Sequence, residues 1–315
     1  MSLSAADSRI RRLRSSKPKV DPSKAHGWLL EEERSASGRV ERALTVFLTG
    51  SECPFTCSFC DLWRFTIDGP TPAGALPKQI ADTLRSVDGP VADRIKLYNA
   101  SNFFDRRAVP AEDIPAIVTL VAPFAGVTVE SHANTIGAQT LELAHQIPGR
   151  LEVAMGLETI HPGAIAHLNK QLDLTRFDRA AGFLADNGIG LRVFVLLGVP
   201  YVPRRESVEC TVRAARYAAD RGATRVSLIP VRGGNGELER LESLGHFTPP
   251  TLAQLETVLE QCLRFTGTVV TADLWDVERL RACEDCRLAR IERIRRMNLT
   301  GRAERRVDCA VCGAG

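Results

Sequence analysis

What the chain lacks narrows the class of protein it can be. No run of 18 or more apolar residues occurs among its 315 residues, so the sequence predicts no membrane-spanning helix. The basic start is not followed by an apolar segment of the kind that secretory signals carry, and we expect a cytoplasmic protein. No G-x-G-x-x-G follows the first predicted strand and no G-x-x-x-x-G-K-[ST] occurs, which disfavours Rossmann and P-loop enzymes.

Aromatic content and net charge are also low. Aromatic residues make up only 6% of the chain, which offers few platforms on which RNA bases could stack. The net charge is only +3, although two segments are strongly basic: residues 9–24 and residues 287–306. Each segment could contact nucleic-acid phosphates. The plainer interpretation is a solvated, disordered arm at the start and a charged helix face near the end.

Cysteine, in contrast, is plentiful. Disulfides are rare in the cytoplasm, so nine cysteines need another explanation there. Cys210 and Cys262 stand alone on helical patterns and are predicted to be small apolar core residues. The other seven cluster at short spacing, which indicates metal binding: Cys53, Cys57, Cys60, Cys283, Cys286, Cys309 and Cys312.

Apolar, β-rich runs alternate with amphipathic helical patterns from residue 42 onward, which predicts an α/β fold with a parallel sheet. A possible seventh strand, 268–275, is followed by a long Arg-rich helix. The glycine-rich segment 232–236 is predicted to be a flexible active-site loop that opens no helix. The six predicted strands are 42–49, 94–100, 126–132, 151–158, 191–198 and 223–231.

Polar residues close three successive predicted strands. Asn99 and Ser101 follow the second strand, Glu130 and His132 end the third, and Glu158 ends the fourth. Because chemistry in parallel α/β folds lies at the carboxyl ends of the strands, we expect these residues to share a pocket.

Cys53, Cys57 and Cys60 follow the first predicted strand with the spacing C-x3-C-x2-C. Thiolates select zinc, copper(I) or iron–sulfur clusters. A structural zinc ion and a [4Fe–4S] cluster both normally take four protein ligands, and the adjacent Asp61 is poorly placed to be the fourth. The triad therefore predicts a metal centre with one position open to a ligand that is not protein.

With Phe59 before the last cysteine, this loop resembles that of the radical S-adenosylmethionine (SAM) superfamily, and the resemblance spans roughly residues 40–265. It implies a partial (βα)6 TIM-like barrel and a [4Fe–4S] cluster whose fourth iron binds the amino and carboxylate groups of SAM. Reductive cleavage of SAM would then give a 5′-deoxyadenosyl radical that abstracts hydrogen from substrate. An electron donor such as flavodoxin or ferredoxin is also implied.

The same resemblance suggests which side chains hold SAM. Asn99 and Ser101 stand where the family usually has a glycine-rich motif for the SAM amino group, and Glu130 stands where many members bring a carboxylate to it. Glu158 is expected near the ribose and Lys170 near the methionine carboxylate. The alternatives are loop capping by Asn99 and Ser101, a surface position for Lys170, and simple strand ends for the two glutamates. No further catalytic residue is predicted.

The C-terminal cysteines form two C-x-x-C pairs, Cys283/Cys286 and Cys309/Cys312, separated by 22 residues. Structural zinc, an auxiliary iron–sulfur cluster and two independent features are all compatible with this spacing. Together with GHFTPP at 245–250, these pairs are similar to the archaeosine-synthase radical SAM lyases, which act on a modified 7-deazaguanine in tRNA, and to the Elp3-like group.

The sequence thus divides into a basic N-terminal extension (1–40), a radical SAM partial barrel (41–267) and a C-terminal Cys- and Arg-rich helical extension (268–315). The first function hypothesis is a radical SAM enzyme acting on an unidentified small molecule. The second is a radical SAM enzyme acting on a tRNA base, with the basic segments bound to RNA. The third is a non-catalytic zinc-ribbon protein that binds nucleic acid.

Overall fold

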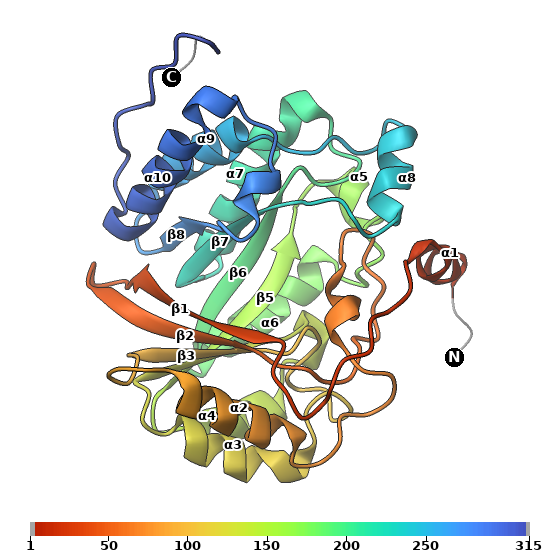
Figure 1. Ribbon diagram of the computed structural model, residues 1–315, viewed down its shortest axis with the longest axis vertical. Helices are drawn as coiled ribbons and strands as arrows, with labels where there is room; N and C mark the ends of the chain where they lie inside the picture. The colour runs from red at the N-terminus through yellow and green to blue at the C-terminus, as the bar shows by residue number, and fades with distance from the viewer. Residues whose placement is uncertain (1–3, 313–315) are drawn as a thin grey trace.

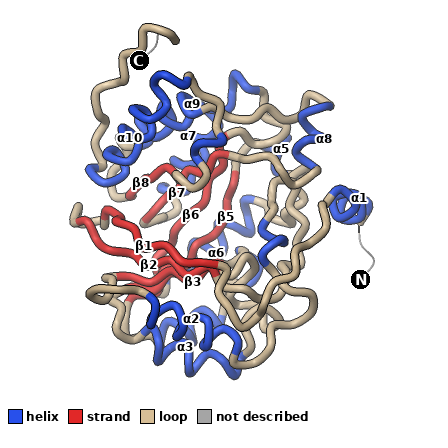
Figure 2. Tube along the Cα trace, in the orientation of Figure 1, coloured by secondary structure: helices blue, strands red, loops and turns tan. Residues whose placement is uncertain are grey.

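A computed structural model describes residues 4–312 of the chain. In this range, eight strands form one curved sheet in chain order, with helices on its outer side (Figures 1 and 2). The sheet is a nearly closed barrel. Its strands are β1 (Gly27–Arg34), β2 (Val40–Phe47), β3 (Arg94–Tyr98), β4 (Gly126–Glu130), β5 (Arg150–Glu158), β6 (Gly190–Leu197), β7 (Arg225–Pro230) and β8 (Val269–Ala272).

Strands β2 to β8 pair in parallel, and only β1 runs antiparallel to its neighbour β2. The six predicted strands correspond to β2–β7, and the possible seventh is β8, so the α/β barrel prediction is confirmed. The helices are α1 (Ala5–Leu13), α2 (Ala75–Ser86), α3 (Ile114–Val121), α4 (Ala138–Gln146), α5 (Pro162–Ile165), α6 (Leu174–Asp186), α7 (Ser207–Asp220), α8 (Glu237–Ser243), α9 (Leu252–Cys262) and α10 (Glu284–Thr300).

The N-terminal extension is folded, so the prediction of a disordered arm is wrong. Ser4 caps α1 by accepting a hydrogen bond from the Asp7 N–H, and Ile10 on this helix is buried. Strand β1 pairs with β2 along its whole length, from Gly27 opposite Phe47 to Arg34 opposite Val40. Its run of glutamates hid the strand at the sequence level, because charged residues rarely signal a buried strand.

Those glutamates belong to a charge network that fills the barrel at the amino ends of the parallel strands. Glu33 of β1 accepts hydrogen bonds from Lys96 of β3 at 2.9 Å and from both terminal nitrogens of Arg192 of β6 at 2.8 and 3.0 Å. Because β1, β3 and β6 are not neighbours in the sheet, these bonds cross the interior. Burial opposes ionisation of Glu33, but the Arg192 and Lys96 cations hold its pKa well below the usual range.

Aromatic side chains also meet across the barrel. The ring centroids of Tyr98 on β3 and Phe194 on β6 lie 6.1 Å apart, and those of Phe47 and Trp275 lie 5.4 Å apart. Tyr98 and Phe47 are the last residues of their strands, and each follows the charge network toward the carboxyl ends. The amino half of the interior is therefore closed by ion pairs, and aromatic rings form a floor above it.

Helix α10 spans the two edges of the sheet. It packs against both edge strands, β1 and β8, as well as against α9. The Asn298 side chain accepts a hydrogen bond from the Ala272 N–H and donates one to the Ala272 carbonyl, both at 2.8 Å. The amide thus takes the place of a neighbouring strand, and the long Arg-rich helix predicted near the end of the chain is confirmed as the element that seals the seam.

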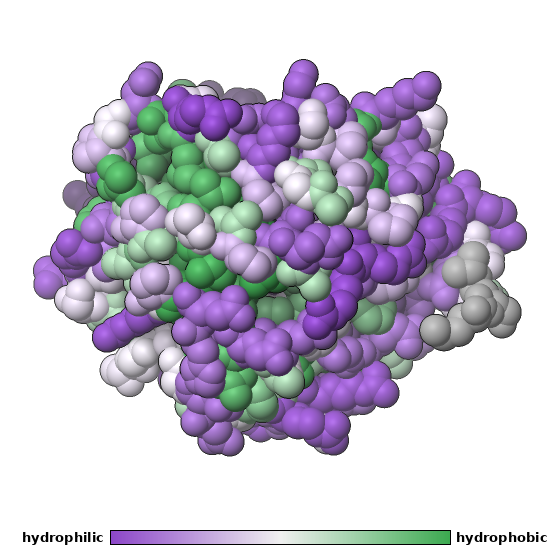
Figure 3. Space-filling model, turned by 90° about the horizontal axis from the view of Figure 1, so that it is seen from below, coloured by the Kyte–Doolittle hydropathy of each residue, from purple (hydrophilic) through white to green (hydrophobic). Residues whose placement is uncertain are grey.

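Helices α2, α3 and α4 cover the opposite side of the molecule, where apolar side chains are interspersed among polar ones at the surface (Figure 3).

Cys262 is fully buried and Cys210 is half-buried against apolar neighbours, as expected for core cysteines. Within residues 4–312, no helix has the length and apolar character needed to cross a membrane.

Candidate functional site

Cys53, Cys57 and Cys60 lie in the loop that follows β2, at the carboxyl end of the sheet, and all three are half-buried free thiols. Burial raises the pKa of Cys57 to about 12 and also raises the pKa of Cys53 and Cys60. The thiols are therefore protonated in the metal-free protein, and binding of iron at this position would release protons.

Three asparagines from different parts of the chain hold this cysteine loop. Asn102 donates a hydrogen bond to the Cys53 sulfur at 3.7 Å, and Asn169 donates one to the Thr56 carbonyl at 2.9 Å. Asn235, which is 2% exposed, donates to the Ser58 carbonyl at 2.9 Å and to the Cys60 carbonyl at 3.4 Å. Sequence reasoning missed these roles, because nothing in an isolated asparagine shows which distant backbone group it will meet.

Asn235 belongs to the glycine-rich segment 232–236, which is not the flexible loop that was predicted. Arg279 donates a hydrogen bond to the Gly233 carbonyl at 2.8 Å, and Glu239 accepts one from the Gly236 N–H at 2.7 Å. Helix α8 begins directly afterwards at Glu237, so the expectation that this segment opens no helix is also wrong. Its backbone is instead fixed against the cysteine loop.

The N-terminal arm holds the same loop from the other side. Glu52, which precedes Cys53, forms ion pairs with Arg14 at 2.7 Å and Lys17 at 3.0 Å. Asp7 on α1 accepts hydrogen bonds from the Thr56 hydroxyl and from the Asn169 amide, the latter at 2.9 Å. Part of the arm's basic charge is therefore paired with an acidic residue of the same chain.

Asn99 and Ser101, both predicted to bind SAM, carry polar atoms that find no partner in the protein. Asn99 is completely buried, yet neither its amide nitrogen nor its amide oxygen is hydrogen-bonded. The Ser101 hydroxyl also has no hydrogen-bond partner. Buried polar groups in native proteins are nearly always satisfied. These atoms therefore fit a bound ligand that has both hydrogen-bond donors and acceptors, as SAM has.

Glu130 lies beside them at the end of β4. Its carboxylate accepts a hydrogen bond from the Ala100 N–H at 2.6 Å, and Ala100 adopts a left-handed backbone conformation with φ of 53° to make this contact. Burial raises the pKa of Glu130 to about 7, although the N–H groups of Ala100 and Asn99 act in the opposite direction. A carboxylate held in this way suits a cationic ligand group.

Glu158 and Lys170 form a buried ion pair at the end of β5. Burial acts to lower the pKa of Lys170, but the Glu158 carboxylate more than offsets it and the pKa is raised, so the ammonium stays charged. A side chain at Gly156 would place its Cβ 1.9 Å from the Glu158 carboxylate, so Glu158 and Lys170 would have to move to admit one. Lys170 is not a surface residue, since its side chain is only 13% exposed.

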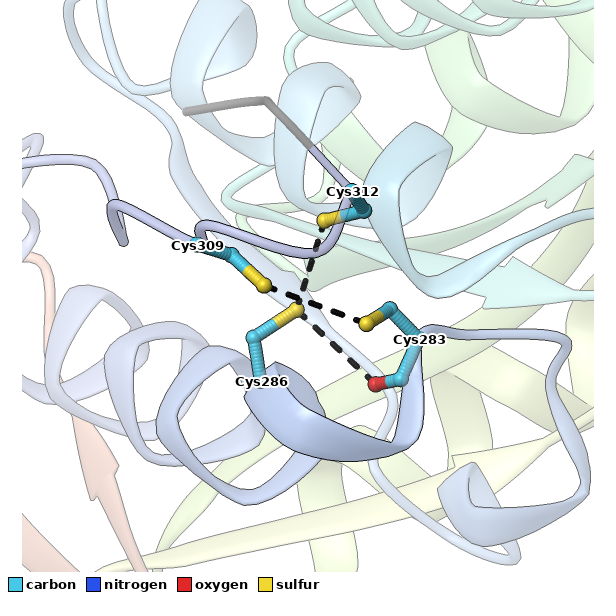
Figure 4. Close-up of side chains that lie close together, drawn as sticks. All are labelled: Cys283, Cys286, Cys309 and Cys312. Carbon is cyan, nitrogen blue, oxygen red and sulfur yellow. Dashed lines mark hydrogen bonds between the residues drawn. The ribbon is translucent and has the colours of Figure 1, made fainter.

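The four C-terminal cysteines meet at a separate place. Their sulfur atoms all lie within 4.8 Å of one another. Figure 4 shows Cys283 and Cys286 at the first turn of α10 facing Cys309 and Cys312 on the returning tail. In Figure 1 the C-terminal end of the chain lies at the top left, whereas the loop after β2 lies on the right. The two sets of cysteines therefore form two distinct centres.

Comparison with known proteins places this geometry in context. No protein-family model matches the chain. The chain is 21% identical to an uncharacterized protein of Methanocaldococcus jannaschii over 53% of its own length and 47% of that protein's. It is 24% identical to archaeosine synthase subunit beta of Methanosarcina acetivorans, over 83% of this chain and 78% of the relative.

Two solved structures are similar in fold. Elp3 from Methanocaldococcus infernus superposes with a TM-score of 0.52 at 14% identity, covering 74% of this chain and 59% of that one. A radical SAM methyltransferase from Sphaerobacter thermophilus gives 0.50 at 18% identity, covering 82% and 76%.

The protein has the radical SAM fold. The resemblance that the C-x3-C-x2-C motif suggested is thereby confirmed at the level of architecture. The chain spans about half the length of the first of these relatives and 59% of the Elp3 chain, so neither whole protein's activity follows from the likeness.

Proposed function

We propose that this protein is a radical SAM enzyme that binds a [4Fe–4S] cluster through Cys53, Cys57 and Cys60. The observation that carries the proposal is the meeting of three thiols with unpartnered buried polar atoms at one edge of the sheet. SAM would contact Asn99, Ser101, Glu130, Glu158 and Lys170. A non-catalytic zinc-ribbon protein would leave both features without a role.

The bound cluster and SAM would supply a 5′-deoxyadenosyl radical that abstracts hydrogen from the substrate, after one electron from a donor such as flavodoxin or ferredoxin. The protein's own contribution is positioning. The clamps from Asn102, Asn169 and Asn235 fix the cysteine loop, and Glu130 and the Glu158–Lys170 pair would present charge to the polar end and the ribose of SAM.

The closed amino half of the barrel leaves the carboxyl end as the route for the substrate. Tyr98 and Phe194 are half-buried and meet across the interior above the charge network. A substrate entering from the carboxyl end would rest on these rings, within reach of the SAM pocket. An aromatic floor suits an apolar or planar group.

A small molecule is the first substrate class. Ion pairs within the chain engage most arginines of the segment 287–306, among them Arg287, Arg293, Arg295 and Arg296, which leaves less charge for RNA phosphates. The second class is a tRNA base. The likeness to archaeosine synthase subunit beta over most of both chains favours that candidate.

The central experiment is anaerobic. Protein reconstituted with iron and sulfide should release 5′-deoxyadenosine from SAM in the presence of dithionite, and Cys57→Ala should release none because a cluster ligand is lost. Cys283→Ala should keep the activity. A reconstituted wild type that binds a cluster but forms no 5′-deoxyadenosine would overturn the proposal.

The effect of tRNA on the rate of SAM cleavage distinguishes the two substrate classes. Transfer RNA that lacks modification should accelerate SAM cleavage only if the second class is correct, and the acceleration should then fall steeply with salt because phosphate contacts release counterions. Cleavage that is indifferent to tRNA at low salt would leave the small-molecule class.

A further inference from the structure

We propose that Cys283, Cys286, Cys309 and Cys312 bind one Zn²⁺ ion that fixes the C-terminal tail across the end of α10. A tetrahedral zinc ion with Zn–S bonds of about 2.3 Å requires its sulfur atoms to stand about 3.8 Å apart. The Cys283–Cys309 sulfurs are separated by 3.9 Å and the Cys286–Cys312 sulfurs by 3.8 Å, and all four lie within 4.8 Å of one another. The four sulfurs are therefore close enough together to bind one ion.

The same distances argue against two other uses of four thiols, a pair of disulfides and a [4Fe–4S] cluster. Disulfide sulfurs would stand about 2.0 Å apart, so neither pair is bonded. In a [4Fe–4S] cluster each thiolate binds a different iron atom, which spreads the ligand sulfurs more widely than around one ion. Among the described residues, the C-terminal group is the one set of cysteines, histidines and carboxylates that lies close enough together to hold a single metal ion.

The surroundings compensate the charge of four thiolates. Arg290 donates a hydrogen bond from Nε to the Cys286 sulfur at 3.2 Å and also pairs with Glu256 on α9. Cys283 is the N-cap of α10 and Cys286 lies in its first turn, where the positive end of the helix dipole favours negative charge. A zinc–tetrathiolate centre is itself negative, so these contacts stabilise it and orient one ligand.

The ion would complete a clasp, by which we mean the contacts that hold the C-terminal tail (residues 302–312) against α9 and α10. Other side chains already make part of these contacts. Arg293 on α10, whose side chain is 1% exposed, donates hydrogen bonds to the carbonyls of Glu304 and Arg305, the latter at 2.9 Å, and pairs with Glu256. Arg306 of the tail reaches Glu260 on α9 at 3.3 Å. Zinc thus joins the start of α10 to the tail that folds back along it, and α10 is the helix that seals the barrel seam.

The first test counts metals in the full-length protein. Wild type should contain one zinc per chain, and the Cys309→Ser/Cys312→Ser double variant should lose the zinc while its reconstituted first cluster keeps its iron and visible absorption. Cys53→Ser/Cys57→Ser should show the reverse, and Cys210→Ser is the matched control that should lose neither. Iron in place of zinc, or iron lost from the 309/312 variant alone, would refute the assignment.

The second test needs no variant and uses wild type alone. The side chains of Arg302, Arg305 and Arg306 are already exposed, but Arg293 holds the backbone of this segment through the Glu304 and Arg305 carbonyls. Stripping zinc with a chelator should therefore speed trypsin cleavage at 302–306 by loosening this backbone, while cleavage at the exposed Arg204 and Arg205 stays unchanged as an internal control. Restoring one equivalent of Zn²⁺ should restore protection. If the tail is equally resistant with and without zinc, the clasp is wrong. Because zinc content is measured without SAM, these results stand apart from the outcome of the SAM-cleavage assay.

Discussion

The two cysteine centres of this protein differ in what they still require. The C-terminal centre has four cysteine sulfurs within 4.8 Å of one another, which is a full set of protein ligands for one metal ion. The three in the loop after β2 are instead accompanied by an unpartnered asparagine amide, an unpartnered serine hydroxyl and a buried carboxyl group. A centre complete in protein ligands holds structure together, whereas an incomplete one can bind and transform a ligand.

Their supports differ in the same sense. The C-terminal centre is built on one helical turn and a tail, so most of its geometry is local. The loop after β2 is held by groups from the N-terminal arm, from the loop after β3, from Asn169 and from the segment after β7. A reactive centre on a loop thus depends on the whole fold for its shape.

The largest effect should come from exchanging one ligand in each centre. Cys60→Ser should abolish 5′-deoxyadenosine formation and lower bound iron while zinc stays at one per chain. Cys312→Ser should weaken zinc binding while SAM cleavage continues at close to the wild-type rate. Metal analysis and nucleoside chromatography on the same preparations check both halves. Equal loss of activity in the two variants would mean that the centres act as one.

A second prediction concerns the effect of the buried Glu130 on the stability of the ligand-free protein. The pKa of Glu130 is raised to about 7 from 4.5, so its contribution to stability is present below pH 4.5 and is lost as the pH rises through 7. In the ligand-free protein, the free energy of unfolding of Glu130→Gln should therefore rise relative to that of the wild type by up to about 3 kcal/mol between pH 5 and pH 8. Denaturant unfolding at both pH values measures the difference. A constant offset between variant and wild type would show that Glu130 does not titrate in this range.

A third prediction tests the asparagine clamps. Asn235→Ala leaves the Ser58 and Cys60 carbonyls without their donor, which should cost about 1–3 kcal/mol of stability and reduce iron occupancy after reconstitution. Asn187→Ala is the matched control, because Asn187 is exposed and its side chain donates a local hydrogen bond to the Phe183 carbonyl. Zinc content should not change in either variant. Full iron loading of Asn235→Ala would remove Asn235 from the support of the loop.

The smallest effect should come from the ion pairs of the N-terminal arm. Arg14→Gln with Lys17→Gln removes two of the three basic partners of Glu52 and leaves Arg11, and partly exposed ion pairs of this kind are worth about 0–1 kcal/mol each. The loss should be larger at low salt than at high salt, because salt screens such pairs. Thermal unfolding of the reconstituted protein in both conditions measures it, with Arg204→Gln/Arg205→Gln as the exposed control. A loss that is independent of salt would point to packing instead of charge.

Much of the barrel was predictable from local patterns. Strands β2 to β8 are apolar runs because both faces of a parallel sheet are buried, and the helices between them carry the periodicity of one buried stripe. Strand β1 and helix α8 were not predicted. The glutamates of β1 are paired with Lys96 and Arg192 from distant strands, so no local pattern marks them as buried.

The candidate site divides in the same way. The sequence by itself determined the three thiols, the polar strand ends and the two C-x-x-C pairs, because spacing along the chain and strand ends are local properties. Only the tertiary structure decided that Asn235 reaches the Cys60 carbonyl, that Glu158 and Lys170 pair with each other, and that the four C-terminal sulfurs lie within 4.8 Å of one another. Those contacts join residues far apart in the chain, and their distances are set by how the strands, helices and tail pack together.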